Sequence, residues 1–316
     1  MTGLNDRYVV SKVDHSVVGE VDHYVVGNID HYVVGNIDHY VVLGNPVAHS
    51  QSPFIHARFA EQTGEGISYD RLLCTAEGFE AAVREFANAG GRGCNITMPF
   101  KTQAWRMAAH FSERAVLAEA SNTLRFDAAG WFADNTDGVG LVRDIELNAK
   151  WPLAGARVLM LGAGGAAAGA LGPLLQARPA ELVVANRSVE KAQALVQRHA
   201  GLADGASVKL QATTLQDCGS QFDVVINATA SSLSAAAVPV SASVLRSGSL
   251  ALDMAYGPSA LAFLDWAHAH GAVGRDGLGM LVEQAAEAFF IWRGVRPDTP
   301  PVLAALLERV NAAAVR

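Results

Sequence analysis

The segment from Val158 to Leu171, VLMLGAGGAAAGAL, constrains the fold of this chain more than any other segment. Its four apolar residues, Val158–Leu161, are typical of a strand buried in a parallel sheet, and the small residues after them predict a tight turn and a helix start. Where such a turn lacks side chains, the backbone can approach a pyrophosphate, whose charge the helix N-terminus attracts. We therefore expect a dinucleotide to bind here, although a turn that only allows close helix packing has the same pattern.

A second apolar run, Leu182–Ala185, predicts a second strand and supports the interpretation of the glycine turn as a dinucleotide site. It lies about twenty residues further on, where enzymes that use NAD carry an acidic residue for the ribose hydroxyls. Here Asn186 is followed by Arg187, Ser188 and Lys191. A site that has cations and lacks a carboxylate favours NADP over NAD, because the cations can bind the additional phosphate of NADP. A solvated helix start is the alternative, but the helix dipole disfavours a cation such as Lys191 in the first turn.

Composition excludes several classes of protein. The chain has 316 residues, of which 50% are hydrophobic and 17% charged, which allows two globular domains. A net charge of −7 argues against a nucleic-acid-binding protein. Cys74, Cys94 and Cys218 are widely spaced, so we expect neither a disulfide framework nor a zinc site. The first residues lack a signal-peptide core and no apolar run is long enough to span a membrane, which predicts a cytoplasmic, soluble protein.

An octapeptide repeat occupies the start of the chain. HYVVGNID recurs with a period of eight from His23, and its last copy runs into Leu43 and Gly44. We expect residues 1–39 to be an extension outside the fold, which forms short hairpins, adds to a sheet edge or stays disordered. Aspartate precedes each of four histidines in the repeat, which are His15, His23, His31 and His39. Flexible repeats rarely preorganise a metal site, so we predict no metal site at these histidines.

From Tyr40 the pattern alternates between strand and helix, which predicts two α/β domains. The first has strands at 40–44, 67–74, 93–97 and 122–126 and helices at 53–62, 79–89 and 102–117. A helix at 137–148 leads to a second unit with strands near Val158, Leu182, Val224 and Leu250. The helix at 277–292 then returns to the first domain. We expect a substrate domain (40–137 plus 277–316) and a Rossmann-type NADP domain (138–276), with a ligand cleft between them.

Four polar clusters follow the predicted strands of the first domain. They are Ser50 with Ser52, Asn95 with Thr97 and Lys101, Asn122 with Thr123, and Asn135 with Asp137. The carboxyl ends of strands face the ligand crevice in open α/β sheets, so these side chains can converge. Together they suit a small polyhydroxylated acid. Singly, each has a structural alternative, because Ser50, Ser52 or Asp137 can cap a helix and Lys101 can be a solvated surface lysine.

The chain from Tyr40 onward resembles the shikimate dehydrogenases. The resemblance is carried by ten motifs in order: HSQSPFIH at 49–56, GCNITMPFK at 93–101, ASNT at 120–123, DNTDGVG at 134–140, GAGGA at 162–166, NRSVEKA at 186–192, NAT at 227–229, DMAY at 253–256, DGLGML at 276–281, and Gln284. Ala230 and Ser231 follow NAT, where the family commonly has Ser and Gly, and Ala133 and Asp134 precede the NTD triplet, where it commonly has Gly.

The resemblance implies roles for individual residues. Lys101 and Asp137 form the catalytic pair. Ser50, Ser52 and Tyr256 hold the substrate carboxylate, and Thr97, Asn95, Asn122, Asp137 and Gln284 take the ring hydroxyls. The implied cofactor residues are Gly162, Ala163, Gly164, Gly165, Ala166, Asn186, Arg187, Ser188, Lys191, Thr229, Met254, Gly277 and Met280, and Glu113 aligns with a cofactor-proximal position in some members.

The implied activity is the reversible, NADPH-dependent reduction of 3-dehydroshikimate to shikimate in aromatic amino-acid (chorismate) biosynthesis, by a monomer or homodimer. A quinate/shikimate dehydrogenase that uses NAD, a non-catalytic NADP- or ligand-binding protein, and a two-domain folate dehydrogenase are the alternatives. Arg187 and Lys191 favour NADP. The Ser50 and Ser52 pair with Gln284 favours the shikimate assignment, and the presence of Lys101 argues against a non-catalytic protein.

Overall fold

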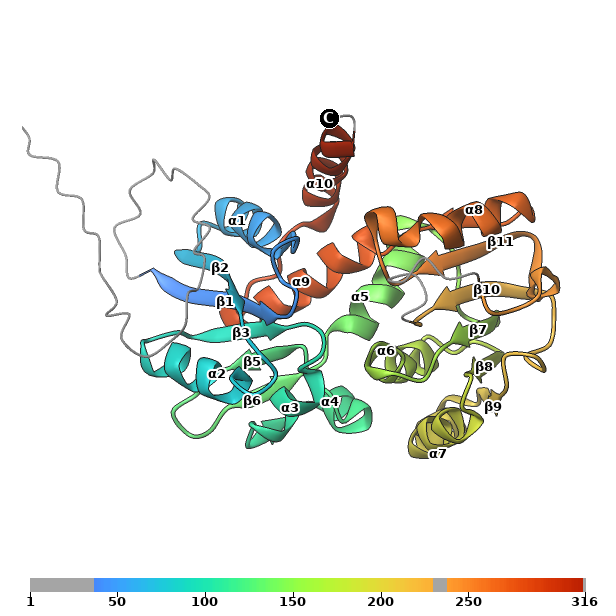
Figure 1. Cartoon of the computed structure of the whole chain (residues 1–316), viewed down its shortest axis with the longest axis horizontal. Helices are drawn as coiled ribbons and strands as arrows, with labels where there is room; N and C mark the ends of the chain where they lie inside the picture. The colour runs from blue at the N-terminus through green and yellow to red at the C-terminus, as the bar shows by residue number, and fades with distance from the viewer. Residues whose placement is uncertain (1–36, 230–237, 315–316) are drawn as a thin grey trace, which may run out of the picture. The chain divides into compact units, whose positions relative to one another are not determined.

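The computed structural model describes residues 37–229 and 238–314. All described residues belong to one compact unit (Figure 1). Most of the octapeptide repeat, including His15, His23 and His31, lies outside the described residues, as do Ala230 and Ser231. Within the described ranges, no helix has the length and apolar character that crossing a membrane requires.

The first sheet has the strand order β2-β1-β3-β5-β6-β4. Strands β2, β1 and β3 are parallel to one another, whereas β5 runs antiparallel to both β3 and β6. This half of the molecule is therefore a mixed sheet. Its strands are β1 (Asp38–Gly44), β2 (Ile67–Leu73), β3 (Gly93–Ile96), β4 (His110–Phe111), β5 (Thr123–Arg125) and β6 (Phe132–Asp134).

The side chains of β1 alternate between two cores because successive residues of a strand point to opposite faces. Val41 and Leu43 pack with the residues of α2 (Phe79–Asn88). Tyr40 and Val42 pack on the opposite face with Tyr69. Helices α1 (Ser52–Thr63) and α9 (Leu278–Arg293) share a separate core with α10 (Thr299–Ala314).

The second sheet consists of six parallel strands in the order β12-β11-β10-β7-β8-β9. This is the order of the dinucleotide-binding fold, whose halves diverge at β7 and β10. The strands are β7 (Arg157–Leu161), β8 (Glu181–Ala185), β9 (Lys209–Thr213), β10 (Phe222–Asn227), β11 (Leu245–Asp253) and β12 (Val273–Arg275).

Both faces of β7 are buried, as its continuous apolar run predicts. Val158 and Met160 pack against α6 (Gly165–Gln176) and α7 (Val189–Ala206), and Leu159 and Leu161 pack on the α8 side (Leu261–Ala269). Figure 1 shows α6 and α7 beside β7, β8 and β9. The predicted strand, glycine turn and helix start are confirmed.

Helix α5 (Asp137–Arg143) continues into a π-helical segment, Asp144–Asn148, and together they span the helix predicted at 137–148. It contacts both α6 and α9. Asp144 is fully buried and receives two hydrogen bonds from the Arg275 guanidinium, at 2.6 and 2.7 Å. The predicted return of the chain is also confirmed, because Phe289 of α9 joins Phe59 of α1 in one core.

The prediction of a single helix at 102–117 is wrong. The segment contains α3 (Lys101–Arg106), the short strand β4 and α4 (Glu113–Ala118). Strand β4 pairs with β6 at the sheet edge, and Ser112 starts a new helix because its Oγ accepts a hydrogen bond from the Ala115 N–H at 3.1 Å. Strand β1 begins at Asp38, two residues before the predicted start, where the last repeat copy follows the one before it.

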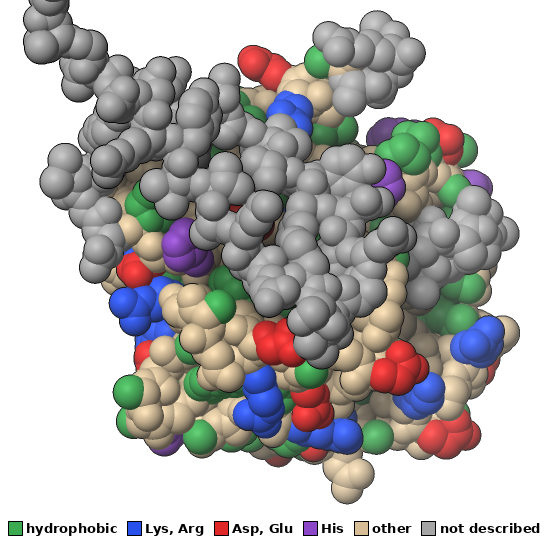
Figure 2. Space-filling model, turned by 60° about the vertical axis from the view of Figure 1, so that its left-hand side comes forward, with side chains coloured by type: hydrophobic (Ala, Val, Ile, Leu, Met, Phe, Trp, Pro, Cys, Tyr) green, Lys and Arg blue, Asp and Glu red, His purple; other side chains and the backbone are tan. Residues whose placement is uncertain are grey.

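Charges of both signs lie side by side on the surface drawn in Figure 2, where Lys and Arg side chains neighbour Asp and Glu side chains. Ion pairs that include exposed side chains, such as Arg92 with Asp38 and Lys209 with Glu181, also combine charges of both signs.

Candidate active site

Lys101 and Asp137, predicted as a pair from distant sequence positions, form an ion pair between Nζ and Oδ2. Each is the first residue of a helix, α3 and α5 respectively. The Lys101 side chain is 18% exposed and the Asp137 side chain 7%. Asp137 does not cap its helix in the predicted alternative way, since the N-cap residue is Thr136. The ammonium is thus held by a nearly buried carboxylate while solvent still reaches it.

Asn122 orients the carboxylate of this pair. Its Nδ2 donates to Asp137 Oδ1 at 2.8 Å, and its Oδ1 accepts the Thr136 backbone N–H at 2.8 Å. Because a backbone N–H can only donate, this contact fixes which end of the carboxamide faces the carboxylate. Nδ2 also lies 3.2 Å from Gln284 Oε1, and Gln284 is fixed in turn by donating to the Leu281 carbonyl oxygen at 2.9 Å.

Asn95 extends the network toward α1. Its Nδ2 donates to the Asn122 carbonyl oxygen at 3.1 Å and to Thr123 Oγ1 at 3.0 Å, and its Oδ1 accepts from the Tyr69 hydroxyl at 2.7 Å. Thr123 Oγ1 donates to Asn122 Oδ1 at 3.0 Å. All four side chains are buried. The structure therefore brings Asn95, Asn122, Asp137, Lys101 and Gln284 into one cluster.

Two residues of this network, Thr136 and Tyr69, were absent from the predicted clusters, and Thr123 was named there without a role of its own. Thr136 lies within the NTD triplet, so its position beside Asp137 was a usable signal. Tyr69 lies on β2, where an aromatic residue is typical of any buried strand. Its contact with Asn95 depends on tertiary structure.

His56 of α1 is a titratable group beneath the network. Its ring stacks on that of Tyr69, with centroids 4.1 Å apart, and both ring nitrogens are buried without a hydrogen-bond partner among the described residues. Burial lowers the pKa of His56 to about 3, so the ring is neutral at physiological pH. It contributes shape and stacking rather than charge.

The predicted carboxylate-binding residues lie at the start of α1. Ser50 Oγ donates to Ser52 Oγ at 3.2 Å, and the Ser52 N–H donates back to Ser50 Oγ at 3.3 Å. The N-cap of α1 is Gln51, without a side-chain bond, so neither serine caps the helix. Tyr256 packs against the core that includes Ile55 of α1. Burial raises the pKa of its phenol.

Thr97 and Glu113 have the weakest structural support among the predicted site residues. Thr97 is half-buried, and its backbone N–H donates to the Leu43 carbonyl oxygen at 2.9 Å beside the end of β1. Glu113 is exposed in the first turn of α4, a helix that contacts α6.

The predicted cofactor loop, Gly162–Ala166, connects β7 to α6 and fits a pyrophosphate. Gly162 has φ +106°, which favours glycine, and a Cβ there would lie 3.0 Å from the Ala228 carbonyl oxygen. Side-chain positions at Gly164 and Gly165 face open space, at the point where the first N–H groups of α6 lack partners within the helix. A phosphate can therefore approach the backbone here.

The predicted 2′-phosphate residues follow β8. Asn186 Nδ2 donates to the Ser188 carbonyl oxygen at 2.8 Å, which orders the turn before α7. Arg187 and Lys191 are exposed, and within the described ranges neither forms an ion pair. Lys191 lies in the first turn of α7, as predicted. These two cations are thus available to an anionic group.

The other predicted cofactor residues gather at the ends of β10 and β11 and the start of α9. The Met254 N–H donates to the Asn227 carbonyl oxygen at 3.0 Å, and Thr229 lies two residues after the end of β10. The Gly277 N–H donates to the Ala255 carbonyl oxygen at 2.9 Å, and Met280 is buried in the next helical turn. Helix α9 thereby connects these residues to Gln284 of the network.

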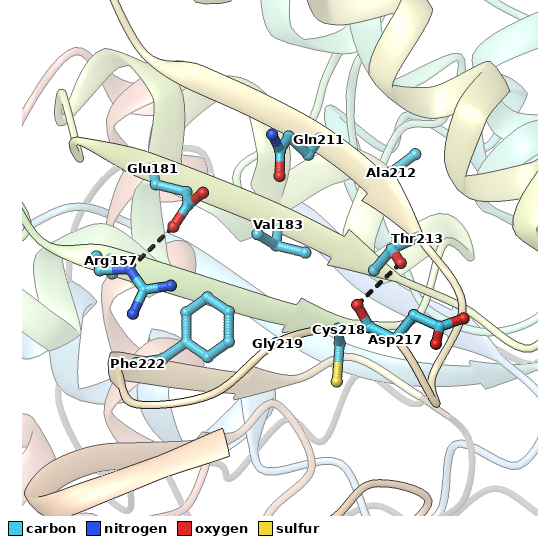
Figure 3. A pocket seen from close by; sticks show the side chains of 10 residues that line it. All are labelled: Arg157, Glu181, Val183, Gln211, Ala212, Thr213, Asp217, Cys218, Gly219 and Phe222. Carbon is cyan, nitrogen blue, oxygen red and sulfur yellow. Dashed lines mark hydrogen bonds and ion pairs between the residues drawn. The ribbon is translucent and has the colours of Figure 1, made fainter. Parts of the chain in front are cut away.

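A pocket of about 470 Å³ lies elsewhere, beside β8 and β9 (Figure 3). An Arg157–Glu181 ion pair and a Thr213–Asp217 hydrogen bond line it. None of the predicted catalytic or substrate-binding residues borders this pocket, and Asp217 and Cys218 come from the short loop between β9 and β10. We therefore assign it no role in the chemistry.

Two features define the class of two-domain, dinucleotide-dependent oxidoreductases. One is the six-stranded parallel sheet with its glycine loop, and the other is the second α/β half, which carries a lysine–carboxylate pair. Family models identify the member of this class. They are described as the shikimate dehydrogenase substrate-binding domain (residues 42–124), shikimate/quinate 5-dehydrogenase (146–255) and the shikimate 5′-dehydrogenase C-terminal domain (277–307).

Individual relatives agree with these models. A protein named shikimate dehydrogenase (NADP(+)) from Methylibium petroleiphilum is 61% identical over 86% of this chain and 95% of its own length. The Ael1 enzyme from Pseudomonas putida is 46% identical with a TM-score of 0.77, over 85% of this chain and 98% of that chain. Shikimate 5-dehydrogenase from Thermus thermophilus, solved with NADP(H) and shikimate, is 30% identical with a TM-score of 0.75, over 87% and 100%. The chain belongs to the shikimate dehydrogenase family.

Proposed function

We propose that this chain catalyses the reversible, NADPH-dependent reduction of 3-dehydroshikimate to shikimate in the chorismate pathway, with Lys101 and Asp137 as the catalytic pair. The observation that carries the proposal is the Lys101–Asp137 ion pair at the edge of a buried network of carboxamides. Family membership supports the reaction, and the geometry of the pair supports the roles.

The proton step falls to Lys101. Bound NADPH would supply a hydride to the carbonyl carbon of the substrate, so that negative charge would develop on the carbonyl oxygen. Because an ammonium has three donors, Lys101 can keep its bond to Asp137 and still give a proton to this oxygen. Asp137 stays oriented by Asn122, so the ammonium points in one direction. In the oxidation of shikimate, Lys101 takes the proton back from the hydroxyl group.

The substrate is held at two ends in this proposal. Ser50, Ser52 and Tyr256 bind its carboxylate, because the two serine hydroxyls already lie 3.2 Å apart at the start of α1. The ring hydroxyls are taken by Thr97, Asn95, Asn122, Asp137 and Gln284. We assign substrate binding to residues 40–137 and 277–316 and NADP binding to residues 138–276.

The nucleotide residues are proposed from their fit to an anionic dinucleotide. The open positions at Gly164 and Gly165 leave room for the pyrophosphate at the start of α6. Exposed Arg187 and Lys191 suit the 2′-phosphate. The nicotinamide side is surrounded by Thr229, Met254, Gly277 and Met280.

We also propose a cytoplasmic location and a monomer or homodimer. The three cysteines are free and buried, which agrees with a cytoplasmic location.

The test is the change in absorbance of the nicotinamide when the purified chain is given shikimate or quinate with NADP or NAD, in all four combinations. Turnover confined to shikimate with NADP supports the proposal. Turnover with quinate and NAD would keep the catalytic pair but reject the specificity, and a folded protein inactive in all four combinations would reject the enzymatic function.

A further inference from the structure

Arg71 of β2 supports the Ser50–Ser52 turn from below. Its Nε and Nη2 atoms both donate to the Ser50 carbonyl oxygen, at 3.1 and 2.5 Å. Residues two apart on a strand share a face, so Arg71 lies on the same side of the sheet as Tyr69 of the buried network. The guanidinium thus fixes the backbone that carries both proposed carboxylate ligands.

The charge of Arg71 is not neutralised by an acidic partner. Arg114 and Arg275, two other partly buried arginines, each pair with a buried carboxylate, Asp134 and Asp144 respectively. Within residues 37–229 and 238–314, Arg71 forms no ion pair, and its described hydrogen bonds go to a neutral carbonyl oxygen. A half-buried cation without a counterion is an attractive neighbour for an anionic ligand.

Tyr256 lies within reach of this charge. Burial raises the pKa of its phenol, and the Arg71 guanidinium opposes that shift, as expected of a cation close to the hydroxyl. Asp276 is the acidic group that acts on the same phenol, and its carboxylate oxygens already accept the backbone N–H groups of Gly257 and Leu278. Arg71 is therefore a cation that acts on the Tyr256 phenol and also holds the Ser50–Ser52 turn.

We propose that Arg71 is a positioning residue of the carboxylate subsite, which orders the Ser50–Ser52 turn and makes the subsite select an anion over a neutral group of the same shape. This proposal rests on the proposed function. Hydroxyl groups can donate to a neutral ester as well as to a carboxylate, and the charge of the carboxylate strengthens that hydrogen bond only in part. A guanidinium behind them stabilises only the charged ligand, because Coulomb attraction requires a charge on both partners.

The experiment compares shikimate with its methyl ester, which has the same ring but no charge. We expect Arg71→Met to raise KM for shikimate about tenfold more than KM for the ester, with little change in kcat. Arg71→Lys should restore part of the discrimination, because it keeps the charge but loses the two-pronged contact. Arg84→Met, which removes an arginine that packs over Trp131 in the same half, is the matched control.

The ratio of the two KM values within one variant separates an electrostatic role from a structural one. If Arg71→Met weakens acid and ester equally, or changes neither, the proposal is rejected. If Arg71→Met does not fold, the ratio in Arg71→Lys decides. If the wild type oxidises neither compound, the proposed function is rejected instead. Calorimetry then measures the affinities of wild type and Arg71→Lys for shikimate and its ester, and these affinities decide the role of Arg71 alone.

Discussion

Lys101 is the residue on which the proposed chemistry depends, and its surroundings explain why a lysine suits this role. Asp137 holds the ammonium, and Asn122 holds Asp137. The 18% exposure of the Lys101 side chain leaves a path to a ligand. A lysine held in this way is oriented before the substrate arrives, so little rearrangement accompanies proton transfer.

Lys101→Met keeps the length of the side chain and removes its charge. We expect kcat to fall by about 10²–10⁴-fold, the usual range for loss of a general acid, while the affinity for NADP is kept. Nicotinamide absorbance measures the first and fluorescence titration the second. Lys209→Met, at an exposed lysine paired with Glu181, is the control. An equal loss of turnover and NADP affinity would contradict the role.

Arg187→Ala tests the 2′-phosphate site. A charged hydrogen bond is lost only when the phosphate is present, so KM for NADP should rise by about 10–100-fold while KM for NAD is unchanged. Steady-state kinetics with both nucleotides provides the control within one variant. A parallel rise for NAD would mean that Arg187 acts on the shared part of the nucleotide.

His56→Phe keeps the ring that stacks on Tyr69 and removes a group whose pKa is lowered to about 3. Protonation favours the unfolded chain, where the pKa is near its ordinary value of about 6.5, so this residue's contribution to stability is complete above that pH and is lost as the pH falls toward 3. The slope is at most about 1.4 kcal/mol per pH unit.

Urea denaturation at several pH values between about 7 and 5, above the ordinary range of carboxylates, measures this dependence. The variant should have the shallower slope. Some slope remains, because burial also lowers the pKa of His199. Identical slopes in variant and wild type would show that His56 is protonated in the fold or neutral in both states.

The residues that we propose to contact ligands were easier to find in the sequence than the residues that position them. Lys101, Asp137 and Asn122 lie in motifs, and the fold brings them together as expected. Tyr69 and Arg71 lie in an ordinary strand, and their roles arise from contacts with Asn95 and Ser50 that are far away in sequence. Such roles depend on the register between strands, which local patterns do not specify.

At the level of elements, the parallel sheet and its glycine loop followed directly from apolar runs and turn residues, whereas the segment at 102–117 did not. Helix-forming residues fill that segment, yet the pairing of β4 with β6 splits it. Pairing of a two-residue strand with a distant strand outweighs local helix propensity, which is worth only tenths of a kcal/mol per residue.

The packing of α9 against the π-helical segment depends on Gly279. A Cβ at this position would overlap Asp144 Oδ1 and lie 2.8 Å from Arg275 Nη2. Asp144 has no room to move, since it is fully buried and held by Arg275 and Asn148. The glycine therefore serves close approach between two elements.

Gly279→Ala should lower the free energy of unfolding by about 1–3 kcal/mol, the usual cost of overpacking. Gly201→Ala is the matched control, because Gly201 lies inside α7 with no neighbouring atom within 4 Å of a new Cβ. It should be neutral or stabilising by up to about 1 kcal/mol. Chemical denaturation measures both, and a Gly279→Ala variant as stable as Gly201→Ala would disprove the packing argument.

At the level of the whole described molecule, the Asp144–Arg275 pair joins the two places where the chain passes between its α/β halves. Asp144 follows α5 on the way to β7, and Arg275 ends β12 just before α9. Arg143 and Thr299 add contacts to Glu283 of α9 nearby. The two crossings are thus connected by side chains as well as by the backbone.

Arg275→Met should destabilise the chain by about 3–5 kcal/mol, because it leaves the fully buried Asp144 carboxylate without its cation. The double variant with Asp144→Leu should lose less than the sum of the single changes, since it removes the stranded charge. Thermal unfolding of the four proteins in this cycle measures the coupling. Additive losses would show that the pair contributes no interaction energy.

The return of α9 to the first half has a consequence for the order in which a newly made chain can complete its cores. Strands β7 to β12 come from one continuous stretch, so this sheet can close as soon as the stretch has been synthesised. The earlier sheet cannot, because Tyr40 stacks on Trp292 and Phe59 packs against Phe289. The sheet that leaves the ribosome first is therefore finished last, and it exposes an apolar face until residues 278–293 emerge.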